Sequence, residues 1–173
     1  MDLKCNSILL RMVEESDAEF ILSLRSDSRY NAHLSTVSSS LQDQVDWICR
    51  YKIDEIERRQ FYFIIERIDG VRCGTVRIYD LTEESFCWGS WILNEEKTKY
   101  AALESAFLVY KYGFTNLGFY KSHFDVRREN HKVISFHERM GAISVREDVE
   151  NIYFEITRSA VEVAMRRLGY DLF

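Results

Sequence analysis

The pattern of apolar and polar positions changes its period several times along the chain, and each change predicts a new element. Short runs of alternating, β-branched and aromatic residues predict strands. The predicted strands are Ile8–Val13, Phe61–Ile68, Val71–Asp80, Ser85–Leu93, Ser122–Val126, Ser144–Glu147 and Ile152–Thr157. Stretches with apolar side chains every three or four residues predict helices. The predicted helices are Ser16–Ser26, Leu41–Glu57, Thr98–Phe114, Asn130–Met140 and Ser159–Leu168.

Local signals predict where some of these elements begin and end. Ser16 with Glu19 three residues later predicts a capping box at the start of the first helix. Asp69 and Gly70 between two apolar runs predict a tight hairpin turn in which both central residues adopt positive φ. Gly141 stands where the end of a helix favours a left-handed backbone.

The order of these elements predicts an α+β fold with a mixed, mostly antiparallel central sheet flanked by helices. A chain of 173 residues is long enough to bury one full core. We expect residues 1–158 to form one domain and residues 159–173 to form a helical tail of that domain. The apolar face of this tail would pack either on the sheet or on a second copy in a homodimer.

Composition and charge narrow the class of protein. The chain is 46% hydrophobic and 29% charged, which is typical of a globular protein and excludes a disordered one. Its net charge of −5 disfavours a nucleic acid as partner. The run Ile8–Leu10 is too short for a signal or membrane segment, so we expect a cytoplasmic protein without a membrane partner. The four cysteines lack CxxC spacing, which predicts reduced thiols and no metal site.

The segment Trp88–Ala106 is the strongest candidate for a binding site. A predicted strand ends at Leu93, a polar loop follows, and a helix begins near Thr98. The first N–H groups of a helix lack partners inside it and attract anions such as phosphate. Lys97 and Lys99 stand at this position, where the helix dipole alone would favour acidic residues. A bound anion would explain them, and two solvated lysines are the alternative.

Three motifs lie in and beyond this segment. Gly89–Leu93 precedes Lys97-x-x-Tyr100-x-Ala102, and Asn130 opens a stretch that closes on Arg139-Met140-Gly141. Together they resemble the GNAT superfamily of acetyl-CoA-dependent N-acetyltransferases, most closely the branch of ribosomal-protein N-terminal acetyltransferases. In that family the loop has the pattern Arg/Gln-x-x-Gly-x-Gly/Ala, so Tyr100 stands where relatives carry glycine.

The resemblance implies that the chain binds acetyl-CoA as a co-substrate. The pantetheine arm would pair with strand backbone, the diphosphate would lie at the start of the helix, and an oxyanion would take an N–H near Ile92. Asn130 would cap its own helix and also contact the arm. The implied cofactor-binding residues are Trp91, Ile92, Leu93, Lys97, Thr98, Lys99, Tyr100, Ala101, Ala102 and Asn130.

The resemblance also implies a general acid and a general base. His137 stands where many relatives carry a tyrosine that protonates the leaving thiolate, and a packed core histidine is the alternative. Asp125 and Asp80 are the preferred candidates for the base, ahead of the turn residues Glu83 and Glu84 and of His123. His123 and Asp125 are two residues apart on a strand, so they share a face and could orient each other.

The implied reaction moves an acetyl group to a primary amine. That amine belongs to a small molecule, such as an amino sugar, or to a protein N-terminus. The acceptor-binding candidates are Tyr30, His33 and Ser90, the first two in the loop between the first helices. Because Tyr100 departs from the family pattern and the base is uncertain, a catalytically silent module that binds coenzyme A or a partner is the alternative.

Overall fold

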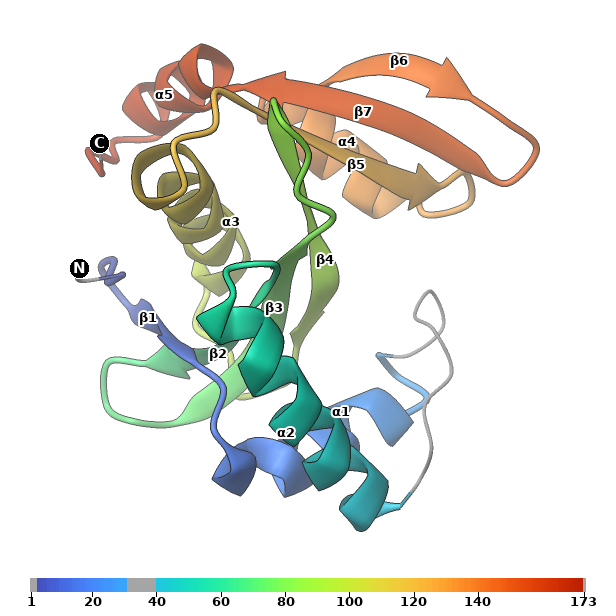
Figure 1. Cartoon of the computed structure of the whole chain (residues 1–173). Helices are drawn as coiled ribbons and strands as arrows, with labels where there is room; N and C mark the ends of the chain where they lie inside the picture. The colour runs from blue at the N-terminus through green and yellow to red at the C-terminus, as the bar shows by residue number, and fades with distance from the viewer. Residues whose placement is uncertain (1–2, 31–39, 173) are drawn as a thin grey trace.

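The computed structural model describes residues 3–30 and 40–172, which form a sheet with helices on both faces (Figure 1). Within these residues seven strands follow the order β1-β2-β3-β4-β5-β7-β6. They are β1 (Ile8–Met12), β2 (Phe61–Arg67), β3 (Arg72–Tyr79), β4 (Ser85–Leu93), β5 (Lys121–Arg127), β6 (Ile143–Glu147) and β7 (Asn151–Thr157). All neighbouring strands are antiparallel except β4 and β5. The predicted mixed, mostly antiparallel α+β fold is confirmed.

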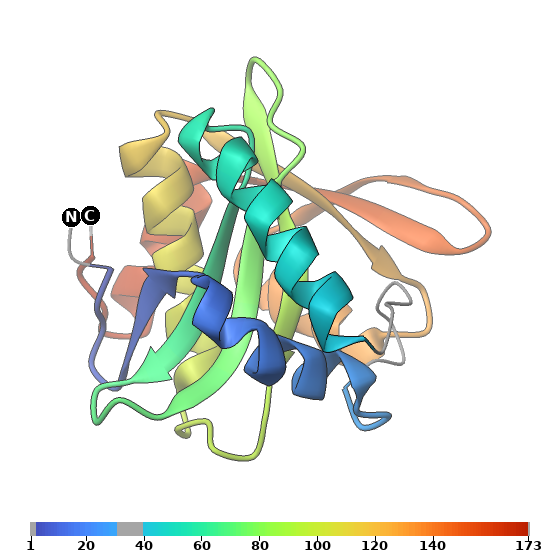
Figure 2. The same ribbon diagram turned by 60° about the horizontal axis from the view of Figure 1, so that its bottom comes forward.

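The helices cover the sheet from both sides. They are α1 (Ala18–Ser26), α2 (Leu41–Ile56), α3 (Ala101–Lys111), α4 (His131–Arg139) and α5 (Arg158–Arg167). Figure 2 shows α1 and α2 on one face, with α3 on the other. Two apolar clusters correspond to these layers, a smaller one under α1 and α2 and a larger one shared by α3, α5 and the rest of the sheet. Burial of these side chains is the main force that holds the layers together.

Two predicted helix boundaries are wrong by a few residues. The helix predicted from Thr98 begins at Ala101, and after Lys111 it continues as a π-helical turn. The hydroxyl of Thr98 lies 2.6 Å from that of Ser7, so Thr98 is tied to the N-terminal segment before the helix starts. Such end effects depend on residues far away in the sequence, which local propensity does not register.

The predicted capping box of Ser16 and Glu19 is also wrong. The carboxylate of Asp17 instead accepts the N–H of Glu14 at 2.9 Å. Asp17 is buried and pairs with Arg11 at 2.8 Å, so its position is fixed by a partner on β1. This ion pair places the turn into α1 one to two residues earlier than the sequence pattern predicts.

The two glycine predictions have different outcomes. Gly141 adopts φ +97° after α4, as predicted for a left-handed helix end. At the β2–β3 hairpin only Gly70 has positive φ, so the prediction for Asp69 is wrong. Arg67 donates its N–H to the carbonyl of Val71, which leaves three residues in the loop instead of two. A three-residue loop needs the left-handed conformation only at its last position.

The strands β4 and β5 are paired only where they begin. Ser85 pairs with Lys121 and Phe86 with Ser122, and beyond these positions the two strands separate. Figure 1 shows β5, β7 and β6 turning away from β4 as one group. Past Phe86, the second edge of β4 therefore has no strand partner among the described residues. The same strand carries a bulge near Ser90, which adopts φ +48°.

The C-terminal helix packs on its own chain. Val161 and Met165 of α5 are buried in the larger cluster, and α5 contacts α3 and β7. The sequence allowed this helix to pack on its own sheet or on a second copy, and in the structure it packs on its own domain. Leu168, after the end of the helix, stays 45% exposed. None of the helices in the described part of the chain is long and apolar enough to cross a membrane.

Candidate active site

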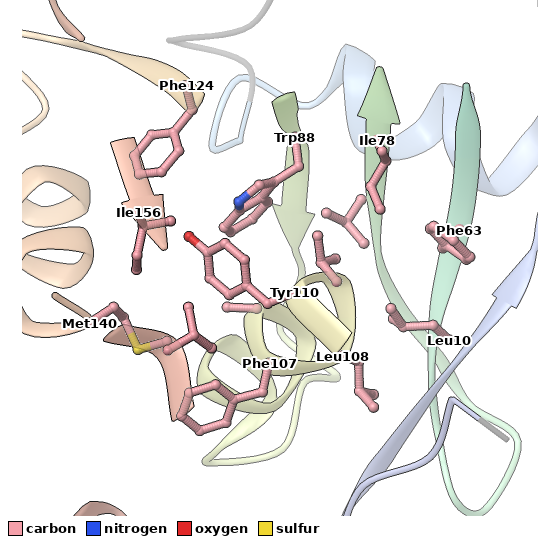
Figure 3. Packing of buried hydrophobic residues seen from close by; sticks show 14 of the residues in the cluster. Leu10, Phe63, Ile78, Trp88, Phe107, Leu108, Tyr110, Phe124, Met140 and Ile156 are labelled. Atoms are coloured by element: carbon pink, nitrogen blue, oxygen red, sulfur yellow. The ribbon is translucent and has the colours of Figure 1, made fainter. Parts of the chain in front are cut away.

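Ring-bearing side chains from four elements pack together where β4 and β5 separate, and this separation of the two strands is called the opening below. They are Trp88 of β4, Tyr110 of α3, Phe124 of β5 and His137 of α4 (Figure 3 shows the first three). The His137 ring centre lies 4.2 Å from that of Phe124 and 5.4 Å from that of Trp88. Nδ1 of His137 is buried without a partner among the described residues, whereas the buried indole of Trp88 lies beside the buried hydroxyl of Tyr110. An unpaired buried nitrogen costs stability, so Nδ1 of His137 is a candidate contact for a ligand with polar atoms.

His137 sits in this opening as a neutral ring. It is 4% exposed, and burial lowers its pKa to about 3. The ring therefore holds no extra proton near neutral pH, although a neutral imidazole still donates one N–H hydrogen bond. The histidine is thus packed in the core and at the same time faces the opening. The general-acid role expected for His137 stays a prediction, and the neutral ring keeps one N–H that can donate a hydrogen bond.

The start of α3 fits a diphosphate. The loop Asn94–Tyr100 leads into α3, and the amides of Tyr100, Ala102 and Leu103 have no hydrogen-bond partner in the part of the chain that is described. Free amides at a helix start attract anions. The ammonium of Lys99 lies over the ring of Tyr100 at 5.0 Å, and Tyr100 is 51% exposed. The side chain of Tyr100, the residue that stands where the family pattern has glycine, is therefore half in solvent.

A buried glutamate anchors the loop in front of α3. Glu104 is fully buried, and its carboxylate accepts the N–H of Ser7 at 3.0 Å and the Ser7 hydroxyl at 2.8 Å. The hydroxyl of Tyr170 donates to the same carboxylate at 3.3 Å. Since Ser7 also contacts Thr98, Glu104 joins both ends of the chain to the cofactor loop. The sequence offered one signal for this role, an acidic residue on the apolar side of a helix.

The base candidates lie on the other face of the sheet from α3. Nδ1 of His123 lies 2.7 Å from the Ser85 hydroxyl, and its Nε2 lies 3.1 Å from the carboxylate of Asp80. The predicted mutual orientation of His123 and Asp125 is therefore wrong, because both ring nitrogens already have other partners. Asp80 adopts φ +49°, which directs its side chain toward His123. Among the described residues, no three His, Cys, Asp or Glu side chains lie close enough to hold a metal ion.

Asp125 lies on β5 between the buried residues Phe124 and Val126. Its side chain is exposed and makes no hydrogen bond with the side chains that the structure describes. Burial raises the pKa of Cys87 on β4 to about 12, and the negative charge of Asp125 acts in the same direction. Cys87 is buried and packs as a small apolar residue, as predicted. Asp125 is thus an exposed carboxylate with no side-chain partner among the described residues.

The structure describes two of the three residues predicted to bind the acceptor, Tyr30 and Ser90. Tyr30 follows α1, and the guanidinium of Arg29 lies over its ring at 5.2 Å. Arg29 also pairs with Glu95 at 2.6 Å, so this segment lies next to the loop before α3. Ser90 lies at the bulge of β4, where its carbonyl accepts the Thr75 hydroxyl at 3.3 Å. His33 lies outside the described residues.

The predicted cofactor residues of β4 and α4 have clear positions. Trp91, Ile92 and Leu93 follow the bulge on the open edge of β4, and the Trp91 indole donates to the Ser105 hydroxyl of α3 at 3.1 Å. The Asn130 side chain accepts the N–H of Val133 at 3.4 Å, so its predicted capping role is confirmed.

Comparisons with known proteins agree with this geometry. Residues 7–143 match the family model described as the acetyltransferase (GNAT) domain. The solved structure "Apo FdhC- a nucleotide-linked sugar GNAT" is 49% identical, covers 98% of this chain and 97% of its own, and has a TM-score of 0.91. The chain therefore belongs to the GNAT acetyltransferase family, whose members transfer an acyl group from coenzyme A.

More distant structures share the fold. The spermidine N-acetyltransferase from Vibrio cholerae, solved with CoA and spermine, is 20% identical over 90% of this chain and 98% of its own, with a TM-score of 0.75. A GNAT-family acetyltransferase from Bacillus anthracis is 18% identical over 92% and 99%, with a TM-score of 0.76. A comparison with curated proteins finds no match. These findings do not show the predicted branch of ribosomal-protein acetyltransferases.

Proposed function

We propose that this protein is an N-acetyltransferase that moves an acetyl group from acetyl-CoA to the primary amine of a nucleotide-linked amino sugar. One observation carries the acyl-CoA part, namely the unpaired edge of β4 beside the unpaired Nδ1 of His137. The acceptor class is supported by the 49% identity with a nucleotide-linked sugar GNAT over nearly the full length of both chains. The neighbours that act on spermidine share too little sequence to support a polyamine acceptor.

Named residues would hold the two ends of the acyl-CoA. The backbone of 91–93 offers its free edge to an extended arm, much as a strand partner would. The amides of Tyr100 and Ala102, with Lys97 and Lys99 nearby, suit the negative charge of a diphosphate. Asn130 caps α4 at the far side of the opening. This arrangement would place the thioester sulfur close to His137.

The reaction needs a group that takes a proton from the amine and a group that stabilises the thiolate of the leaving coenzyme A. The neutral amine attacks the thioester carbonyl carbon, so that a C–N bond forms, the C–S bond breaks, and coenzyme A leaves as a thiolate. His137 donates an N–H hydrogen bond to the sulfur, and Asp125 accepts the proton that the amine gives up. Holding the amine next to the thioester between β4 and β5 would remove much of the entropic cost of their encounter.

A panel of acceptors tests this proposal. Acetyl-CoA should first raise the melting temperature of the protein, because a ligand stabilises the folded state that binds it. Release of free coenzyme A is then measured with dTDP- and UDP-linked amino sugars, the free amino sugars, spermidine and a short peptide with a free N-terminus. We expect release only with a nucleotide-linked sugar. Release with the peptide would favour the protein N-terminus, and binding without any release would favour the silent module.

The cell compartment stays a prediction of the sequence. An acetyl-CoA-dependent enzyme with four free cysteines suits a reducing cytoplasm. Fractionation of the host cell tests this prediction directly.

A further inference from the structure

An arginine without an anionic partner lies on the α1–α2 face of the sheet. Arg77 of β3 is half-buried, and its Nε is buried without a hydrogen-bond partner. Its guanidinium carbon lies 4.6 Å from the ring centre of Tyr79 and 5.7 Å from that of Trp47 on α2. Two aromatic faces therefore hold the group in place while its hydrogen-bonding edge stays unused.

The electrostatic surroundings of Arg77 are short of negative charge. No carboxylate in the described part of the chain pairs with it, and the sequence between residues 31 and 39 contains neither Asp nor Glu. Burial lowers the pKa of Arg77, and the positive charge of Arg25 on α1 acts in the same direction. A cation held out of water without a counter-charge is costly. A bound anion would remove that cost.

Arg77 also lies close to the proposed reaction centre. It pairs with Gly89 across β3 and β4, directly before the bulge at Ser90. A Cβ at Gly89 would lie 2.8 Å from the hydroxyl of Tyr79, so the missing side chain leaves room for the ring that supports the guanidinium. Neighbouring strands are about 4.8 Å apart. Arg77 is therefore one strand from the edge of β4 that would face the thioester, a separation comparable to the size of a sugar ring.

We propose that Arg77 binds a phosphate of the acceptor and thereby selects a sugar carried on a nucleoside diphosphate. This inference rests on the proposed function and deepens it by assigning the residue that recognises the acceptor. The planar guanidinium suits two hydrogen bonds to phosphate oxygens. The same positive charge, reinforced by Arg25, disfavours a polyamine. A free amino sugar lacks the phosphate and would gain nothing from Arg77.

Three variants test this assignment. Arg77→Gln removes the charge, Arg77→Lys keeps it without the planar fork, and Arg50→Gln removes an equal charge from an exposed position of α2. Calorimetry measures the Kd of UDP and of dTDP, each without a sugar. We expect Arg77→Gln to weaken binding by roughly 10- to 100-fold, as for a lost charged hydrogen bond. Arg77→Lys should weaken nucleoside diphosphate binding less than Arg77→Gln does. Arg50→Gln should have the same Kd as the wild type.

Kinetics provide the second readout. Arg77→Gln should raise KM for the nucleotide-linked amino sugar and leave KM for acetyl-CoA unchanged, which also shows that the variant is folded. Nucleoside diphosphate binding that is absent in the wild type, or equal in Arg77→Gln, would overturn the inference. A wild type that binds UDP or dTDP through Arg77 but acetylates no nucleotide-linked sugar would overturn the proposed function and leave the inference standing.

Discussion

At the scale of single residues, His137 constrains the chemistry most. Many relatives carry a tyrosine at this position, and a tyrosine hydroxyl keeps its proton near neutral pH. The buried imidazole is likewise a neutral donor, because burial holds its pKa at about 3. Under the proposed function, either side chain would donate a hydrogen bond to the leaving sulfur. A histidine in place of the tyrosine thus changes the position of the donor, while both side chains stay neutral near pH 7.

The low pKa of His137 predicts a loss of stability in acid. The unfolded chain binds a proton at pH below about 6.5, whereas the folded chain does so only below about 3. Between these values the free energy of unfolding falls as the pH falls, by up to roughly 1.4 kcal/mol per pH unit. Urea titrations from pH 7 to pH 4 should show a shallower decline for His137→Phe than for the wild type. Equal slopes would contradict the burial of a neutral ring.

Asp125 is the residue expected to take the amine proton. Asp125→Asn should lower kcat roughly 10²- to 10⁴-fold, the usual contribution of a general base. Asp80→Asn is the matched control, because Asp80 contacts His123 and its loss disturbs only that contact. Steady-state kinetics at saturating acetyl-CoA compare the two variants. If Asp80→Asn were the more damaging change, the proton would leave through His123 and Asp80 instead.

At the scale of elements, the anchor of the loop before α3 gives another prediction. Glu104→Gln keeps the shape of the side chain but weakens its hydrogen bonds to Ser7 and Tyr170. Loss of charged hydrogen bonds costs about 1.5–3 kcal/mol each. We expect a lower melting temperature and a higher KM for acetyl-CoA, with kcat little changed. Tyr170→Phe, which removes one weaker contact, should show the same pattern to a smaller extent.

The elements themselves could be predicted largely from the sequence, because local periodicity determines them. Every predicted strand and helix is present, and the N-cap at Asn130 and the left-handed Gly141 are correct. The errors at two helix starts share one cause. The starts of α1 and α3 depend on contacts with Arg11 and Ser7, which lie far from them in sequence or on another element. Local patterns carry no information about such partners.

At the scale of the whole molecule, the sequence indicated the family but not the shape of the site. The separation of β4 from β5 depends on the packing of both halves of the sheet, so no motif encodes it. The partners of His123 and the isolation of Arg77 likewise follow only from the way strands align. Three-dimensional arrangement was thus needed to rank the candidate bases and to find a cation that lacks a counter-charge.

A crystal structure with coenzyme A tests the central claim most directly. The account predicts that the diphosphate contacts the amides at the start of α3 and that the arm lies along the free edge of β4. The sulfur should then lie between β4 and β5, within reach of His137. Coenzyme A bound elsewhere on the protein, or an opening that stays empty at saturating coenzyme A, would contradict the account.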